Sequence, residues 1–243
     1  MRIDRLLANS GYGSRSEVRA LIRAGRVALA GTTVRDPGTD IPDSERSALR
    51  IDGQPALIRR YYYLMLDKPS GVITALDDPT HRTIAEFIPA AYEHAGLSPV
   101  GRLDRDTTGL LILTNDGILN HRLTSPKHGV EKVYDVVFTG PPLDPINDPP
   151  GFAAGIKLAD GFCCQPAKLQ IIGSHHAQLT ITEGKFHQVK RMFAAGEREV
   201  TALRRLSVGP LQLDSSLGSG GIRELTEAEI TALYETASLE RPY

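Results

Sequence analysis

Two aspartates, Asp104 and Asp106, lie in a polar segment that leads directly into a run of aliphatic residues. Residues 101–117 read Gly-Arg-Leu-Asp-Arg-Asp-Thr-Thr-Gly-Leu-Leu-Ile-Leu-Thr-Asn-Asp-Gly. The aliphatic and β-branched run over 108–114, followed by an Asn-Asp-Gly turn, predicts a buried strand. Because protein scaffolds usually present reactive groups on loops, we expect a carboxylate held at the start of this strand to do chemistry.

Two kinds of chemistry fit this pair of carboxylates. A single aspartate can act as nucleophile or base beside a sugar, as the acids of glycosidases do. Alternatively, Asp104 and Asp106 can ligate magnesium in a metal-dependent hydrolase. A bare Asp-x-Asp is weak evidence for a metal, so we predict no metal site and expect Asp106 to bond within its loop or to be exposed.

The segment around Asp104 resembles the signature of the pseudouridine synthases, in particular the RsuA group, which acts on ribosomal RNA. Three further segments resemble motifs of that family in the same order: a Lys-Pro motif over 63–71, a tyrosine strand over 131–134 and a basic helix over 183–193. The resemblance covers nearly the whole chain. It implies an enzyme that isomerises a specific uridine of ribosomal RNA to pseudouridine.

The substrate implied by the resemblance is small-subunit ribosomal RNA. Thr107-Thr108 and the segment 187–193 look more like the small-subunit enzyme. A large-subunit enzyme of the same group and a non-catalytic RNA-binding protein of ribosome assembly are the alternatives. The expected partner is therefore ribosomal RNA or an assembly intermediate of the ribosome.

The resemblance also implies roles for residues in the reaction, which breaks the N1–C1′ bond and rejoins the uracil through C5 without a cofactor. Asp104 supplies the carboxylate, which either attacks C1′ or removes a ribose proton. Tyr134 stacks on the uracil. Lys190 is expected to pair with Asp104, because a buried carboxylate needs a nearby cation to stay ionised.

Three further residues are predicted to contact the substrate: Arg102, His187 and Arg191. Lys190 and Arg191 are neighbours on a predicted helix and point about 100° apart, so we expect one of them to reach the cleft. We assign Lys190 to Asp104, and Arg191 to a phosphate or a structural carboxylate.

The first 59 residues carry the excess of positive charge. They hold ten basic and seven acidic residues, whereas the remainder holds 18 basic and 22 acidic ones. Ser14 and Glu17 have the form of a capping box that starts a helix over about 15–24. On it Arg15, Arg19 and Arg23 recur every four residues, with Arg26 near the same azimuth. Such a stripe is either a solvated face or an RNA-phosphate contact; the resemblance of the segment to the RNA-binding module of ribosomal protein S-four favours RNA.

We expect an α+β protein with two domains: an RNA-binding domain over 1–59 and a catalytic domain with a central cleft over 60–243. The linker is expected near 54–60. Strands are predicted over 61–66, 110–114, 133–138, 169–172 and 178–182, and a closing helix starts at the capping box Thr226–Glu229. The proline-rich stretch 140–151 predicts an irregular loop.

Composition excludes several other classes of protein. The 243 residues are 41% hydrophobic, with no run near the ~20 residues that a membrane span requires. Charges interrupt the first residues at once, which argues against a secretory signal and for the cytoplasm. Cys163 and Cys164 are adjacent, which suits neither a disulfide nor a zinc site. We expect a monomer.

Overall fold

The computed structural model describes residues 1–93 and 95–241, which divide into two compact units. The first unit comprises Met1–Tyr62 and Ile88–Leu97, and the second comprises Tyr63–Phe87 and the chain from Ser98 onward. The rings of Tyr62 and Tyr92 meet edge to face at 5.6 Å, which links the two pieces of the first unit. The sequence did not predict that 88–97 join the first unit, and the domain boundary at residue 59 stays a prediction.

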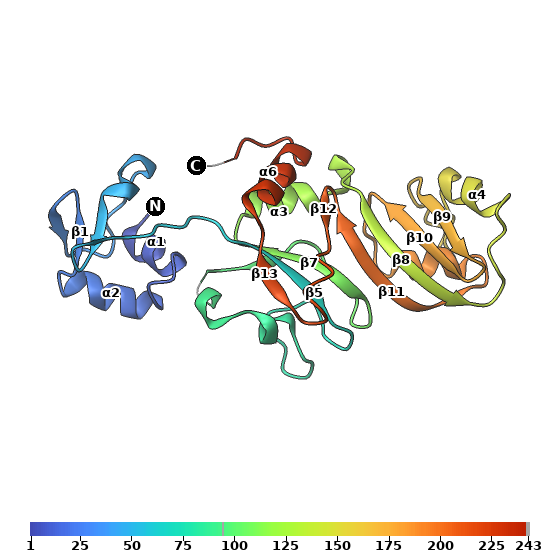
Figure 1. The fold of residues 1–243 in the computed structure, drawn as a ribbon, viewed down its shortest axis with the longest axis horizontal. Coiled ribbons are helices and arrows are strands. Elements are labelled where there is room, and N and C mark those ends of the chain that lie inside the picture. Colours follow the sequence, from blue (N-terminus) through green and yellow to red (C-terminus); the bar gives the residue numbers. More distant parts are fainter. Residues whose placement is uncertain (94, 242–243) are drawn as a thin grey trace. The chain divides into compact units, whose positions relative to one another are not determined.

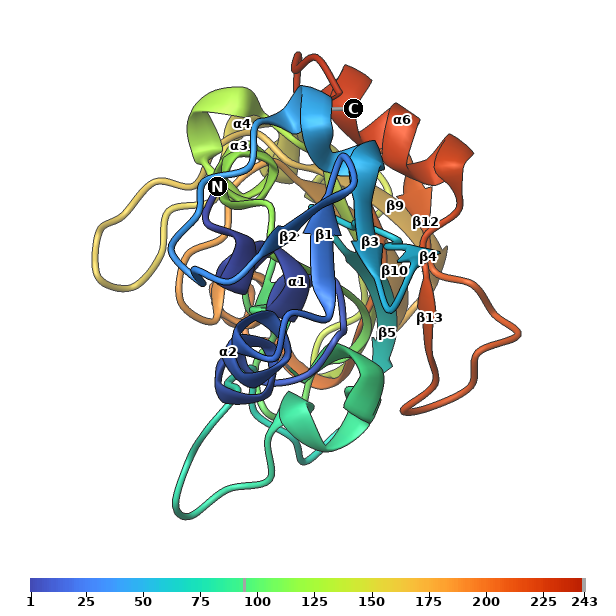
Figure 2. The ribbon, with the colours of Figure 1, turned by 90° about the vertical axis from the view of Figure 1, so that its left-hand side faces the viewer.

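The first unit packs two helices against one side of a small antiparallel sheet (Figure 2). The order of its strands is β2-β1-β3-β4. Its fully buried core joins Ile3, Leu6 and Ile22 of the helices to Val27 and Leu49 of the strands. The elements are α1 (Ile3–Asn9), α2 (Arg15–Arg23), β1 (Val27–Leu29), β2 (Thr32–Val34), β3 (Leu49–Ile51) and β4 (Gln54–Pro55).

Two predictions for this unit have clear outcomes. The capping box of α2 is confirmed: the Ser14 hydroxyl accepts from the Glu17 amide at 3.3 Å, and the Glu17 carboxylate accepts from the Ser14 amide at 2.7 Å. The prediction that a linker begins at Gln54 is wrong, because β4 pairs with β3 in the sheet.

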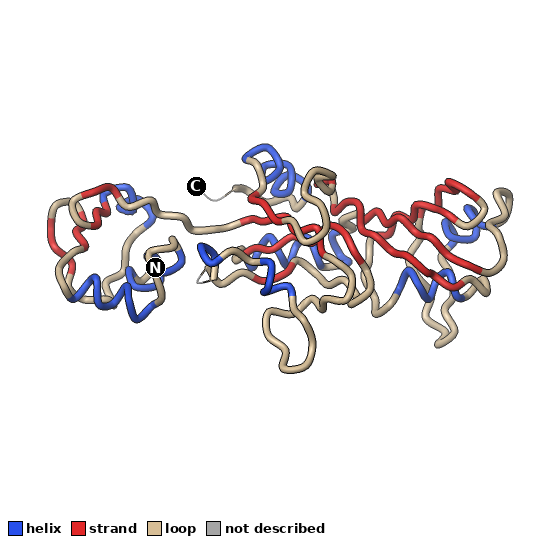
Figure 3. The backbone as a smooth tube through the Cα atoms, turned by 60° about the horizontal axis from the view of Figure 1, so that its bottom comes forward, coloured by secondary structure: helices blue, strands red, loops and turns tan. Residues whose placement is uncertain are grey.

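The second unit is built on one mixed sheet of nine strands within the described residues (Figures 1 and 3). The main order is β13-β5-β7-β11-β8-β10-β9, and all described pairings are antiparallel except that of β7 with β11. Short β12 and β6 add to β11 and β7. The strands are β5 (Tyr63–Lys68), β6 (Ser98–Pro99), β7 (Thr108–Thr114), β8 (Lys132–Thr139), β9 (Lys168–Gly173), β10 (His176–Ile181), β11 (Glu199–Val208), β12 (Leu211–Gln212) and β13 (Ile222–Glu224).

The helices of this unit are α3 (Gly117–Thr124), α4 (Asp148–Ala154), α5 (Gln188–Ala194) and α6 (Glu227–Thr236). The Tyr234 hydroxyl of α6 donates a hydrogen bond to the carboxylate of Asp116, the N-cap residue of α3. Together with the two sheets, the helices confirm the α+β class. No helix in the described ranges is long and apolar enough to cross a membrane.

The prediction of an irregular loop over 140–151 is partly wrong, because α4 begins at Asp148 and contains Pro149 and Pro150. Both prolines lie in the first turn, where backbone N–H groups have no partner within the helix, so the missing donors cost nothing. The strand β11 was not predicted. Its charged residues Glu199, Arg204 and Arg205 hide the alternation on which strand prediction depends.

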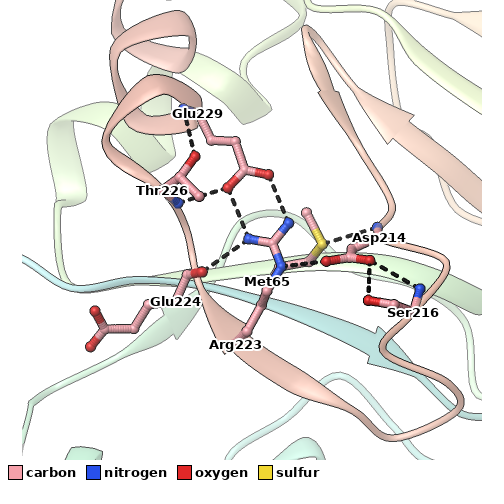
Figure 4. Close-up of polar contacts among 7 residues, drawn as sticks. All are labelled: Met65, Asp214, Ser216, Arg223, Glu224, Thr226 and Glu229. Carbon is pink, nitrogen blue, oxygen red and sulfur yellow. Dashed lines mark hydrogen bonds and ion pairs between the residues drawn. The ribbon is translucent and has the colours of Figure 1, made fainter.

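An arginine between two carboxylates ties the closing helix to the sheet (Figure 4). Arg223 of β13 bonds Asp214 at 2.7 Å and both oxygens of Glu229 at 2.8 Å. Glu229 also accepts from the Thr226 amide, which confirms the predicted capping box at the start of α6. The hydrogen bonds of Arg223 lower the pKa of Glu229 to about 2 although burial opposes this.

Candidate active site

Asp104 lies in the loop between β6 and β7, and a buried lysine holds this loop. Lys68, the last residue of β5, is fully buried and donates through Nζ to the carbonyls of Pro69 at 3.0 Å, Arg105 at 3.3 Å and Thr107 at 2.9 Å. An ammonium group has three hydrogens to donate, so these three carbonyls satisfy it fully. The segment that follows Asp104 is thereby fixed to the C-terminal end of β5.

The charge of Lys68 is stabilised only in part. Burial lowers the pKa of Lys68 to about 8, while the carboxylates of Asp106 and Asp104 act in the opposite direction. At neutral pH the lysine is therefore charged and keeps all three hydrogen bonds. Lys68 of the Lys-Pro motif therefore positions the loop that carries Asp104. This role of Lys68 was not predicted from the sequence.

The residue before Asp104 is held from the other side of the loop. The Thr74 hydroxyl donates to the Leu103 carbonyl at 2.7 Å and accepts from the Leu103 amide at 3.1 Å. The Gly71 amide donates to the Arg105 carbonyl at 2.8 Å. Asp104 is therefore flanked by backbone groups with fixed partners, which limits the positions that its carboxylate can take.

A glycine allows the strand after Asp104 to approach its neighbour closely. Gly109 of β7 has φ +100°, and a Cβ built on it would lie 2.3 Å from the carbonyl oxygen of Arg205 in β11. Only glycine fits this contact and this backbone conformation. The Gly109 of the motif thus permits the parallel pairing of β7 with β11, and the buried Arg205 bonds the Leu110 carbonyl through Nε at 2.8 Å.

Asp104 and Tyr134 line the same pocket, which is open to solvent. Tyr134 comes from β8 and is 7% exposed, and the side chain of Asp104 is 29% exposed. The lining residues are Arg102, Leu103, Asp104, Thr107, Tyr134, Ile181, Gly184, Lys185, His187, Gln188, Val189 and Leu203.

The strongest contact of Lys190 is to Asp106, which differs from the pairing predicted from sequence. Its Nζ atom bonds both carboxylate oxygens of Asp106 at 2.6 Å and lies 4.0 Å from Oδ2 of Asp104. Burial acts to raise the pKa of Asp106, but the hydrogen bonds and charge of Lys190 outweigh it, so the pKa lies below its usual value. Lys190 thus contacts both carboxylates, with Asp106 the nearer.

His187 and Arg191 flank the pocket in different ways. Nε2 of His187 lies 3.7 Å from Oδ1 of Asp104. Arg191 forms an ion pair with Asp160 at 2.5 Å and is absent from the pocket lining. Of the two partners predicted for Arg191, a phosphate or a structural carboxylate, the structure shows a carboxylate; the predicted contact of Arg191 with the substrate stays a prediction. Arg102 lines the pocket and is exposed.

The four arginines of the predicted stripe divide into two pairs. Nε of Arg19 bonds the buried carboxylate of Asp4 at 2.9 Å, and Arg26 forms an ion pair with Asp52 at 2.5 Å. The side chains of Arg15 and Arg23 are exposed, and no hydrogen bond or ion pair engages them within residues 1–93 and 95–241. Two of the four guanidinium groups are therefore paired with carboxylates, Asp4 in α1 and Asp52 after β3. The other two, on Arg15 and Arg23, are available to bind phosphates.

Residues 62–195 match the family of RNA pseudouridylate synthases, and residues 1–46 match the S4 domain. The chain is 42% identical over 240 residues to an uncharacterized RNA pseudouridine synthase of Bacillus subtilis, YtzG, covering 97% of this chain and 99% of the relative. It is 39% identical to ribosomal small subunit pseudouridine synthase A of Escherichia coli, covering 96% and 100%. A crystal structure of a pseudouridylate synthase matches with a TM-score of 0.67 and 38% identity, covering 96% and 99%.

The chain therefore belongs to the family of RNA pseudouridylate synthases and carries an S4 domain at its front. It is an RNA-binding isomerase, and the resemblance to the RsuA group is confirmed by the near full-length relatives.

Proposed function

We propose that this enzyme isomerises one uridine of small-subunit ribosomal RNA to pseudouridine, with Asp104 as the catalytic carboxylate and no cofactor. The observation that carries this proposal is the presence of Asp104 and Tyr134 in one pocket, at the end of a loop that Lys68 fixes. The chain is similar, along almost its whole length, to enzymes named ribosomal small subunit pseudouridine synthase A. This similarity supports small-subunit ribosomal RNA as the substrate. We propose that the enzyme acts as a monomer in the cytoplasm.

The target uridine must leave its stack to reach the pocket, which costs a few kcal/mol. Asp104 then acts at the ribose, either on C1′ or on a ribose proton, while the ring of Tyr134 covers the uracil. The N1–C1′ bond breaks, and the detached uracil turns and forms its new bond from C5 to C1′, which regenerates the Asp104 carboxylate. C5 then loses its proton and N1 gains one, so the product is an isomer of the substrate. Side chains of Lys190 and His187 both lie within 4.0 Å of the Asp104 carboxylate.

The basic first unit has a distinct part in this proposal. Arg15 and Arg23 offer two exposed guanidinium groups that can bind phosphates of the RNA. Contacts with phosphates contribute to RNA affinity but do not distinguish between bases. They therefore increase binding of the substrate and do not act in the chemical step. We therefore assign RNA capture to residues 1–59 and isomerisation to residues 60–243.

Mapping pseudouridines in ribosomal RNA from cells with and without this gene tests the proposal. We expect one small-subunit pseudouridine to disappear and to return when the gene is restored. Loss from large-subunit RNA would instead identify the other substrate of this group, and an unchanged map would contradict a ribosomal substrate. Activity of the purified enzyme should persist in EDTA, because the proposed chemistry needs no Lewis acid.

A further inference from the structure

A phenylalanine beside the pocket is exposed to solvent. Phe186 is 76% exposed, which is unusual for a large aromatic side chain. Its ring is stacked on that of the next residue, His187, with ring centroids 3.8 Å apart and an angle of 18° between the planes. Two parallel rings therefore form a flat surface of which one face, that of Phe186, is left to solvent.

The backbone beneath these rings is held in a defined conformation. His187 has φ +51°, a left-handed conformation that non-glycine residues rarely adopt and that clusters at functional sites. The Gln188 side chain accepts from the Lys185 amide at 2.8 Å and donates to Glu183 at 2.6 Å. Both bonds join a residue before Phe186 to Gln188 after it, and the bond to Glu183 is buried. The turn is therefore fixed in a conformation that leaves the Phe186 side chain in solvent.

The rings lie next to the pocket while Phe186 stays outside it. His187 lines the pocket, with Nε2 3.7 Å from Oδ1 of Asp104, whereas Phe186 is absent from the lining. The pocket already contains Tyr134 for the target uracil. The exposed face of Phe186 is thus suited to a different base, one adjacent to the target in the RNA.

The surroundings of Phe186 favour a nucleic acid over an apolar partner. Lys185 and Arg102, both exposed, lie on the same pocket lining. Cationic groups beside an aromatic platform are the combination with which proteins bind single-stranded RNA: the cations follow the phosphates and the ring stacks on a base.

We propose that Phe186, backed by His187, stacks on an unpaired base that directly flanks the target uridine. The flanking base leaves its own stack when the uridine is flipped, and stacking on Phe186 replaces part of that interaction. Phe186 is therefore a positioning residue for the RNA. The inference rests on the proposed function, since it takes the pocket of Asp104 as the site of the target uridine.

The test compares Phe186→Ala, Phe186→Leu and Phe186→Trp for single-turnover conversion of a small-subunit RNA transcript, with enzyme in excess of the RNA but below saturation. We expect kcat/KM to fall between about 5-fold and about 150-fold with alanine, the range for loss of one stacked base. Leucine should behave as alanine does, and tryptophan as wild type, because the flat π face is what matters. Ile146→Ala, at a side chain that is 78% exposed, is the matched control and should have no effect.

A second substrate shows whether Phe186 acts on the flanking base. Transcripts joined by ligation would carry an abasic nucleotide immediately before or after the target. At one of these positions wild type should fall to the rate of Phe186→Ala, and the variant should lose no more. Equal rates of wild type and Phe186→Ala on intact RNA would overturn the proposal. It would also be overturned if the abasic nucleotide and Phe186→Ala lowered the rate additively at both positions; the exposed ring would then suit a protein partner.

The variant Asp104→Asn tests the pocket separately. If Asp104→Asn stays active, the proposed site of the target uridine is wrong, whatever the result for Phe186.

Discussion

The ammonium group of Lys190 bonds both carboxylate oxygens of Asp106 at 2.6 Å. The carboxylate of Asp106 is 66% exposed, whereas the side chain of Lys190 is 24% exposed and lies 4.0 Å from Asp104. Asp106 thus holds Lys190 near the carboxylate of Asp104 without itself entering the pocket lining. The basic group that the sequence predicted for Asp104 is shared between two aspartates.

Replacing Asp106 with asparagine should change the single-turnover rate by less than about tenfold, because Lys190 is then free to pair with Asp104. The salt dependence of the rate at saturating RNA should also be unchanged. A loss as large as that of an Asp104 variant would show that Asp106 takes part in the chemistry. Restoration of wild-type activity by added magnesium would in that case favour the metal-dependent alternative.

Lys68→Met should destabilise the protein by about 2–4 kcal/mol, since three carbonyls lose a charged donor inside the protein. The freed loop should lower kcat more than it raises KM, because Asp104 loses its position while the RNA contacts remain. Urea unfolding and single-turnover kinetics measure both effects. Lys127→Met, at an exposed lysine, is the matched control. Wild-type kcat in Lys68→Met would contradict the positioning role.

Glu229→Gln should lower stability at neutral pH by about 2 kcal/mol, because glutamine keeps the cap of α6 but loses the ion pair with Arg223. The pKa of Glu229 is about 2 in the folded protein, against 4.5 as its usual value. The ion pair therefore contributes fully above about pH 4.5, and its contribution is lost as the pH falls toward 2. The difference in melting temperature between wild type and variant should shrink over that window. A difference that stays constant over this window would show that the lost stability does not come from the charge of Glu229.

Arg15→Ala combined with Arg23→Ala should weaken RNA binding and make the salt slope shallower by up to about two units, one for each phosphate that is no longer neutralised. With saturating RNA the chemical step should approach wild type. Arg19→Ala is the contrasting variant: it should lower stability, since the buried Asp4 loses one of its two arginine partners and keeps only Arg2. An unchanged salt slope in the double variant would make the stripe a solvated helix face.

The sequence predicts those elements that local chemistry determines. Ser14 and Thr226 each begin a helix because a hydroxyl and a carboxylate three residues later cap it, and both capping boxes are confirmed. The five predicted strands are present, with ends that differ by no more than two residues. The prediction failed at β11, where the strand interior carries Arg204 and Arg205, and at α4, where prolines fit the first turn.

The site was predictable in its residue types and only partly in its contacts. The motif around Asp104 and the tyrosine strand point to residues that do share a pocket. The partner of Lys190 depends on how a helix and a loop 84 residues apart in sequence meet, which no local pattern encodes. Lys68 went unassigned because a lysine at the end of a strand usually reaches solvent, whereas here three carbonyls satisfy it inside the protein.

The most direct test of the central claim is the single-turnover rate of Asp104→Asn on a small-subunit RNA transcript, measured as uridine converted to pseudouridine. The substitution keeps the shape of the side chain and removes its charge, so the fold and RNA affinity should remain near wild type. We predict that the rate falls by more than about 1000-fold, the equivalent of ~4 kcal/mol of barrier. A rate within about tenfold of wild type, with RNA saturating, would contradict the assignment of Asp104 as the catalytic carboxylate.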